Sequence, residues 1–126
     1  MSHSLTVAAA LGNTELVRAL AESGADVNER GADGSTALLH AVVAGNLEMA
    51  LTLVKAGADV NLAAPDGWTA LMKACLWGRA ELVSLLLNHG ADIRTRTPDG
   101  WTAHKVAVEQ GNARVLQMLN GAGVPK

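Results

Sequence analysis

The side chains in this sequence that could do chemistry are four histidines, one cysteine and a recurring aspartate. His3, His40, His89 and His104 stand at unrelated places, and neither among themselves nor with Cys75 do they show the spacing of a metal site. No serine stands in a plausible arrangement with a histidine and an acid for nucleophilic catalysis. We therefore expect no metal site and no catalytic site, and Cys75 is predicted to be an inert packing residue.

The aspartates recur as Asp33, Asp66 and Asp99, each followed by glycine and, two residues later, by threonine. Paired carboxylates would suit general acid–base catalysis, but this recurrence with Gly and Thr favours turn formation. The glycines end helices or form turns, and no Lys-Ser or Lys-Thr pair follows a glycine-rich loop as phosphate binding requires. The sequence therefore predicts no cofactor, no small-molecule ligand and no enzymatic activity.

The composition narrows the class of partner. The net charge of −2 lacks the basic excess that nucleic-acid binding needs, and no run of about 18 apolar residues predicts a membrane span. A single cysteine fits a reducing compartment, so we expect a cytoplasmic or nuclear location. Three Trp occur without Phe or Tyr, which leaves Leu, Val and Ala to fill the core.

The elements that position these residues follow from an internal repeat. Gly-Ala-Asp-Val-Asn occurs at 24–28 and 57–61, and a shift of 33 residues leads on to Gly-Ala-Asp-Ile at 90–93. The same shift relates Asp-Gly-x-Thr-Ala at 33–37, 66–70 and 99–103, and it also relates the glycines at 12, 45, 78 and 111. Three patterns that share one period identify a repeat protein.

Each repeat is predicted to contain two short helices. Thr36, Thr69 and Thr102 each follow a turn and precede an apolar segment, which is the place of a helix N-cap. The first helices then run to residues 44, 77 and 110 and end at a glycine. The second helices carry apolar residues at helical spacing and end at glycines 24, 57, 90 and 123. The segment that follows extends into the next Asp-Gly turn and should form a projecting finger.

In these patterns the sequence resembles the ankyrin repeat family over nearly its whole length. The resemblance implies an all-α solenoid of four helix-turn-helix repeats with projecting β-turn fingers, in a single domain of residues 1–126. The repeats fall at about 1–30, 31–63, 64–96 and 97–126. The family's Thr-Pro-Leu-His becomes Thr-Ala-Leu-Leu, Thr-Ala-Leu-Met and Thr-Ala-His-Lys here. We expect the first and last copies to act as caps with water-tolerant end faces.

Family members usually bind partners through the finger tips and the inward face of the first helices. The resemblance therefore places partner-binding residues at Asp33, Ser35, Val43, Asp66, Trp68, Leu76, Trp77, Asp99, Trp101 and Gln110. All three Trp belong to this set. Trp68 and Trp101 should be neighbours on adjacent fingers, with Trp77 at the far end of the helix between them. Exposed aromatic clusters are typical of interfaces, although Trp before Thr also packs on neighbouring turns for structural reasons.

We therefore expect a monomeric module that binds another protein, as an adaptor or an inhibitor, without catalysis and without contact to nucleic acid or membrane. Two alternatives stay open. The regular repeats would suit an engineered or structural scaffold, although the irregular entries at Leu39, Met72 and Lys105 and the single Cys75 speak against it. The chain would also suit an accessory subunit that recruits substrates to a separate enzyme.

Overall fold

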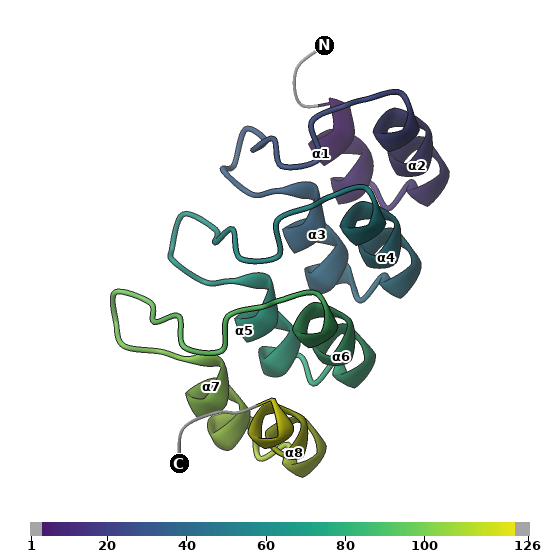
Figure 1. Ribbon diagram of the computed structural model, residues 1–126. Coiled ribbons are helices and arrows are strands. Elements are labelled where there is room, and N and C mark those ends of the chain that lie inside the picture. Colours follow the sequence, from purple (N-terminus) through teal and green to yellow (C-terminus); the bar gives the residue numbers. More distant parts are fainter. Residues whose placement is uncertain (1–3, 123–126) are drawn as a thin grey trace.

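The computed structural model describes residues 4–122; Gly123, predicted to close the last helix, lies outside them. Across this range the chain forms eight helices in four consecutive pairs, and the prediction of an all-α repeat fold is confirmed. Figure 1 shows the pairs stacked in one column, with the first helix of each pair beside the projecting loops and the second on the side away from them. The helices are α1 (Ser4–Ala10), α2 (Thr14–Glu22), α3 (Ala37–Ala44), α4 (Leu47–Lys55), α5 (Ala70–Leu76), α6 (Ala80–Asn88), α7 (Ala103–Gln110) and α8 (Ala113–Gly121).

The inner helices α3, α5 and α7 begin where the threonines predicted. The hydroxyl oxygens of Thr36, Thr69 and Thr102 accept hydrogen bonds from the backbone amide three residues later, at 3.3, 3.2 and 3.1 Å. Each threonine has extended backbone angles, as an N-cap should. These caps fix the point at which the chain leaves each finger and enters a helix.

The inner helices end at or next to a glycine. Gly45 and Gly111 are the C-caps of α3 and α7, with left-handed φ values of 73° and 66°. Helix α5 stops one residue earlier than expected, at Leu76, so that Trp77 is its C-cap and Gly78 takes the left-handed conformation, with φ 65°. Trp77 is therefore held at a helix end rather than within a helix.

The core uses small residues, as the absence of Phe and Tyr requires. An alanine recurs at one position of every inner helix, and Ala8, Ala41, Ala74 and Ala107 are all exposed by 1% or less. A methyl side chain at this position allows neighbouring elements to approach closely. Larger buried side chains such as Leu38 and Leu71 fill the space on either side.

The last repeat turns a polar face outward, as a cap should. Lys105 is exposed. Leu39 and Met72, at the same repeat position, are only 2% and 1% exposed. A lysine tolerates water where, within residues 4–122, no further repeat packs against it. The last repeat therefore exposes a charged side chain where the two preceding repeats bury an apolar one.

The first repeat does not make its outer face polar, and the expectation of an N-terminal cap is wrong in this respect. Leu16 is 44% exposed, whereas Met49 and Leu82, at the equivalent position, are 0% and 2% exposed because the preceding repeat covers them. The described part of the chain therefore ends in an apolar face at the first repeat.

Candidate functional site

The fingers are β-turns with a fixed hydrogen-bond pattern. In the first, the amide of Gly34 donates to the carbonyl of Gly31 at 3.0 Å, and the amide of Gly31 donates to the carbonyl of Ser35 at 2.9 Å. The same two bonds recur in the fingers at residues 64–68 and 97–101. The glycine of each turn has φ between 82° and 87°, the left-handed region that glycine favours. The three loops project on one side of the stack in Figure 1.

The aspartates form the turns, as expected, in two of the three fingers. The Oδ1 atoms of Asp33 and Asp66 accept the amides of Ser35 and Trp68 at 2.9 and 3.0 Å. In the third finger the amide of Trp101 donates to Thr97 Oγ1 instead, at 3.0 Å. The carboxylate of Asp99 is therefore exposed and unpaired within residues 4–122.

Side chains also tie successive fingers together. One guanidinium nitrogen of Arg30 donates to the carbonyl of Gly34 in its own finger at 2.6 Å and to the carbonyl of Ala63 in the next at 2.7 Å. The ring of Pro65 packs on Gly34, where an added Cβ would stand 2.5 Å from Pro65 Cγ. These contacts hold adjacent fingers in register without the histidine of the family pattern.

Trp68 and Trp101 lie side by side on adjacent fingers, as predicted. Their ring centroids are 6.1 Å apart, the ring planes meet at 40°, and Lys105 Nζ lies 4.8 Å from the centroid of the Trp101 ring. Both indoles are half-buried and pack against the core. We call these two residues the aromatic pair. Their packing has a structural role, and part of each ring stays accessible.

Trp77 belongs to a different group of side chains, at the C-terminal ends of the inner helices. It is 55% exposed, while Val43 on α3 is 44% exposed and Leu11, just after α1, is 78% exposed. Leu76 is half-buried beside Trp77. We call Leu11, Val43, Leu76 and Trp77 the apolar row. Within residues 4–122, the ring contact joins the aromatic pair alone and does not include Trp77.

The remaining predicted site residues are accessible. Asp33, Asp66 and Asp99 are exposed at the finger turns, Ser35 is half-buried, and Gln110 is exposed at the end of α7. The apolar row therefore gives way to a polar residue in the last repeat. The ten predicted residues form two groups, one on the fingers and one at the helix ends.

The sequence reasoning missed His40. Its Nε2 lies 3.6 Å from Asp33 Oδ2, so the first finger contacts the side of α3. His40 also lines a hollow of 260 Å³ together with Val7, Ala10 and the finger residues 31–33. The sequence holds a signal for this residue, because His40 and Lys73 are polar residues at the same position of two successive inner helices.

A second missed residue is Arg79, at the start of an outer helix. The N-caps of α2, α4 and α8 are Asn13, Asn46 and Asn112. Their side chains accept the amide three residues later at 3.0 to 3.1 Å. Arg79 stands at the same place before α6 and makes no such bond. An asparagine cap contributes about 1 kcal/mol, so α6 lacks a stabilising contact that the other outer helices have. Comparing the four repeats at this position would have revealed the exception.

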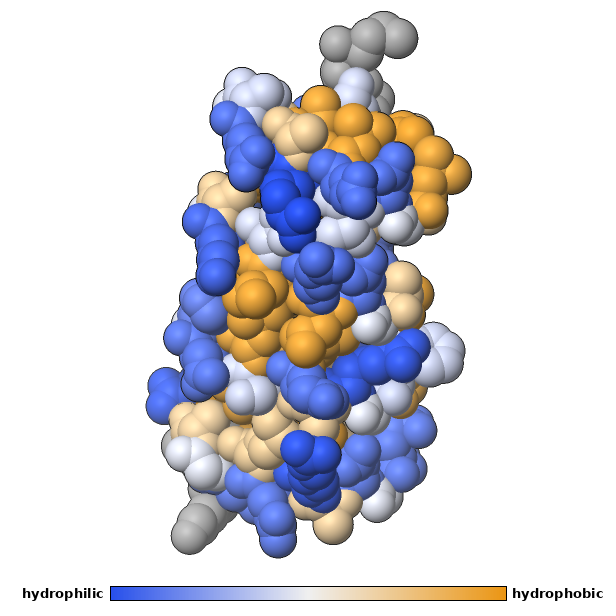
Figure 2. All heavy atoms as spheres, turned by 90° about the vertical axis from the view of Figure 1, so that its right-hand side faces the viewer, coloured by the Kyte–Doolittle hydropathy of each residue, from blue (hydrophilic) through white to orange (hydrophobic). Residues whose placement is uncertain are grey.

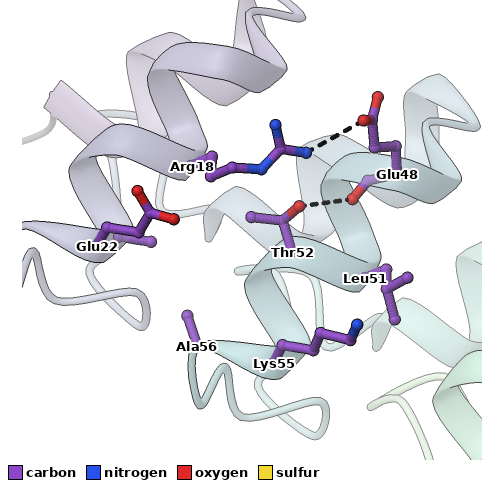
Figure 3. A pocket seen from close by; sticks show the side chains of 8 residues that line it. Arg18, Glu22, Glu48, Leu51, Thr52, Lys55 and Ala56 are labelled. Atoms are coloured by element: carbon purple, nitrogen blue, oxygen red, sulfur yellow. Dashed lines mark hydrogen bonds and ion pairs between the residues drawn. The ribbon is translucent and has the colours of Figure 1, made fainter.

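The side of the stack that is formed by the second helices of the pairs carries a separate groove. Figure 2 shows apolar patches among polar side chains on this face. A groove of 570 Å³ lies between α2 and α4, where Arg18 and Glu48 form an ion pair of 3.1 Å. Figure 3 shows this pair with Thr52, whose hydroxyl donates to the Glu48 carbonyl. A smaller groove of 420 Å³ lies in the equivalent place between α6 and α8. Because the groove recurs with the repeat and contains no predicted site residue, we assign no site to it.

Cys75 is a packing residue, as predicted. Burial raises the pKa of the Cys75 thiol from 9.0 to about 12, and the side chain is 0% exposed, so at neutral pH it is a protonated packing residue. Within residues 4–122, no three or more His, Cys, Asp or Glu side chains form a group that could hold a metal ion. None of the helices in this range has the length and apolar character needed to cross a membrane.

Comparison with known proteins agrees with the repeat structure. A family model for ankyrin repeats, in three copies, matches residues 3–64 and 53–125. No curated protein matches the chain. Ankyrin repeats are general protein–protein interaction modules and are typically not catalytic. The paired helices, the projecting fingers and this match agree, and the chain belongs to the ankyrin repeat family.

Proposed function

We propose that this protein binds a partner protein through the surface formed by the fingers and the C-terminal ends of the inner helices, as an adaptor or an inhibitor that does no catalysis itself. The observation that carries the proposal is the exposure of the apolar row. Trp77 and Val43 stand on adjacent repeats and are 55% and 44% exposed, although both are apolar. Exposed apolar side chains on neighbouring repeats suit contact with a partner.

The aromatic pair supports the same proposal from the finger side. Trp is enriched at interface positions where truncation costs most of the binding energy, because its ring buries a large area at a small cost in conformational entropy. The half-buried rings of Trp68 and Trp101 are held in place by their contact with each other and by Lys105. A partner would therefore meet rings that are already ordered.

The finger carboxylates supply polar contacts at the edge of this surface. Asp33, Asp66 and Asp99 are all exposed at the turns, one in each finger. A regular row of carboxylates suits basic groups on a partner, and such contacts at an interface edge govern the association rate more than the affinity.

The proposal is tested by comparing two variants of the apolar row with one control variant. Val43 and Leu16 are both 44% exposed. Val43 belongs to the apolar row, whereas Leu16 lies at the end of the stack that the first repeat forms. Proteins captured from a cell extract by the natural chain are quantified against those captured by Val43→Ser, Trp77→Ala and Leu16→Ser. We expect a partner that is retained by Leu16→Ser and is lost with Trp77→Ala, with a decrease in affinity of about 30-fold.

Circular dichroism melting checks that the variants remain folded, which we expect because the replaced side chains are largely exposed. The proposed binding surface would be contradicted if Trp77→Ala and Val43→Ser captured the same proteins, in the same amounts, as the natural chain. A partner lost only with Leu16→Ser would move the binding surface to the outer face of the first repeat.

A further inference from the structure

The side chain of Arg79 leaves the helix that it precedes and reaches the preceding repeat. A Cβ added to Gly45 would stand 2.7 Å from the guanidinium carbon of Arg79, so the guanidinium lies over the backbone at the end of α3. Gly45 is two residues after Val43, and Arg79 is two residues after Trp77. The positive charge is therefore held next to the chain segments that carry two members of the apolar row.

The asparagines at the equivalent positions serve the structure with short side chains. Asn46 accepts the amide of Met49 at 3.0 Å and donates to the Thr14 hydroxyl at 2.9 Å, which joins two repeats. Asn112 accepts the amide of Val115 at 3.0 Å. Arg79 makes neither kind of bond, so the exchange of asparagine for arginine removes structural contacts from α6.

The guanidinium is also without a partner. Its Nε atom is buried with no hydrogen-bond partner in the described part of the chain, and no carboxylate between residues 4 and 122 forms an ion pair with Arg79. A buried polar atom without a partner costs free energy. Because Nε is buried, only the two Nη atoms of the guanidinium are open to a partner. Departures of this kind from the local rule are expected at functional positions.

We propose that Arg79 is the residue that selects the partner: it binds a carboxylate on the segment that covers the apolar row. This inference rests on the proposed function and adds the chemistry of the partner to it. The guanidinium presents paired donors whose geometry matches a carboxylate. A single arginine suits a carboxylate better than a phosphorylated side chain, which proteins usually bind with a cluster of arginines. The expected partner segment carries Asp or Glu close to an aromatic or aliphatic side chain.

The test uses a display library of short random peptides as the probe. The library is selected in parallel against the natural chain, Arg79→Asn, Arg79→Lys and Trp77→Ala. We expect peptides selected on the natural chain to carry Asp or Glu at a fixed spacing from an apolar residue, and we expect this enrichment to vanish on Arg79→Asn. A synthetic peptide from this pool should bind Arg79→Asn about 10-fold or more weakly and Arg79→Lys with an intermediate loss, because lysine keeps the charge without the paired donors. Amidating the peptide's C-terminus distinguishes a side-chain carboxylate, which keeps its binding, from a terminal one, which does not.

Stability provides an independent readout. Arg79→Asn restores the asparagine cap, so its urea midpoint of unfolding should rise while its affinity for the peptide falls. The matched control is Asn112→Ala in the last repeat, which removes an asparagine cap without adding a charge: its midpoint should fall and its peptide affinity should stay within about twofold of the natural value. A merely structural arginine would predict the opposite, with Arg79→Asn less stable than the natural chain.

The outcomes separate the two proposals. Peptides that need Trp77 but bind Arg79→Asn unchanged would overturn the role of Arg79 and leave the proposed function in place. Acidic enrichment that persists on Arg79→Asn would overturn it as well. A selection that yields no peptide sensitive to Trp77→Ala or Arg79→Asn would count against both.

Discussion

The side chain of Asn61 joins the base of its finger to the next repeat, because its Oδ1 atom accepts the backbone amide of Asp92 at 2.7 Å. Its Nδ2 atom donates to the carbonyl of Gly90 at 3.1 Å, so one side chain satisfies two backbone groups across the repeat boundary. Asn28 makes the first of these bonds to Asp59, also at 2.7 Å, one repeat earlier. The two asparagines therefore tie three successive finger bases together.

We expect Asn61→Ala to lower the free energy of unfolding by about 1–2 kcal/mol, because it removes two hydrogen bonds between repeats. Asn28→Ala should cost less, since a single side-chain bond across the boundary is lost there. Urea denaturation followed by circular dichroism measures both. An equal cost for the two variants would mean that the bond to Gly90 adds nothing to stability.

Substitutions of Gly34 and Gly100 distinguish the cost of backbone strain from the cost of disturbing the contact between fingers. Both have left-handed backbone angles, with φ of 82° and 86°, but a Cβ on Gly34 meets Pro65 at 2.5 Å whereas a Cβ on Gly100 has open space around it. Gly100→Ala should cost about 1–2 kcal/mol from strain. Gly34→Ala should cost about 1–3 kcal/mol more, from overpacking against the next finger. Thermal melting of the two variants tests the difference, and matching melting temperatures would show that the fingers separate freely.

Leu16 and Met49 stand at the same repeat position but in different surroundings. Met49 is 0% exposed, so Met49→Ala should cost about 2–5 kcal/mol. Leu16 is 44% exposed on the outer face of the first repeat, so Leu16→Ala should cost about 0.5 kcal/mol. Chemical denaturation measures both values. A cost for Leu16→Ala close to that for Met49→Ala would show that another part of the protein covers this face.

Cys75 should make stability depend on pH in alkaline solution. Burial raises the pKa of its thiol from 9.0 to about 12, so the folded state holds the proton more tightly than the unfolded state. The resulting stabilisation is complete below pH 9.0 and is lost between pH 9.0 and about 12, at about 1.4 kcal/mol per pH unit.

The control for this prediction is Cys75→Val, since Val42 occupies the equivalent position and is also 0% exposed. The natural chain should lose stability more steeply than Cys75→Val as the pH rises through this window, measured by urea denaturation at a series of pH values. Parallel curves for the two proteins would show that the thiol does not titrate differently in the folded and unfolded states.

Much of this fold was predictable from the sequence because its signals are local. Thr36 caps a helix through an amide three residues away, and Asp33 closes a turn through an amide two residues away. Such contacts depend on the order of neighbouring residues, and the repeat presents the same local pattern several times. The neighbouring positions of Trp68 and Trp101 followed from the same period, because equivalent residues of adjacent repeats stack.

The sequence by itself thus determined the repeats, the helix starts and the finger turns. Only the tertiary structure decided which residues at equivalent repeat positions are buried by a neighbouring repeat. Leu16 is exposed and Met49 is buried because a neighbouring repeat covers one and not the other. That the Arg79 guanidinium finds no partner within residues 4–122 was likewise outside the reach of the sequence pattern. Exposure and side-chain direction depend on packing between repeats, and no local pattern encodes the presence of a neighbour.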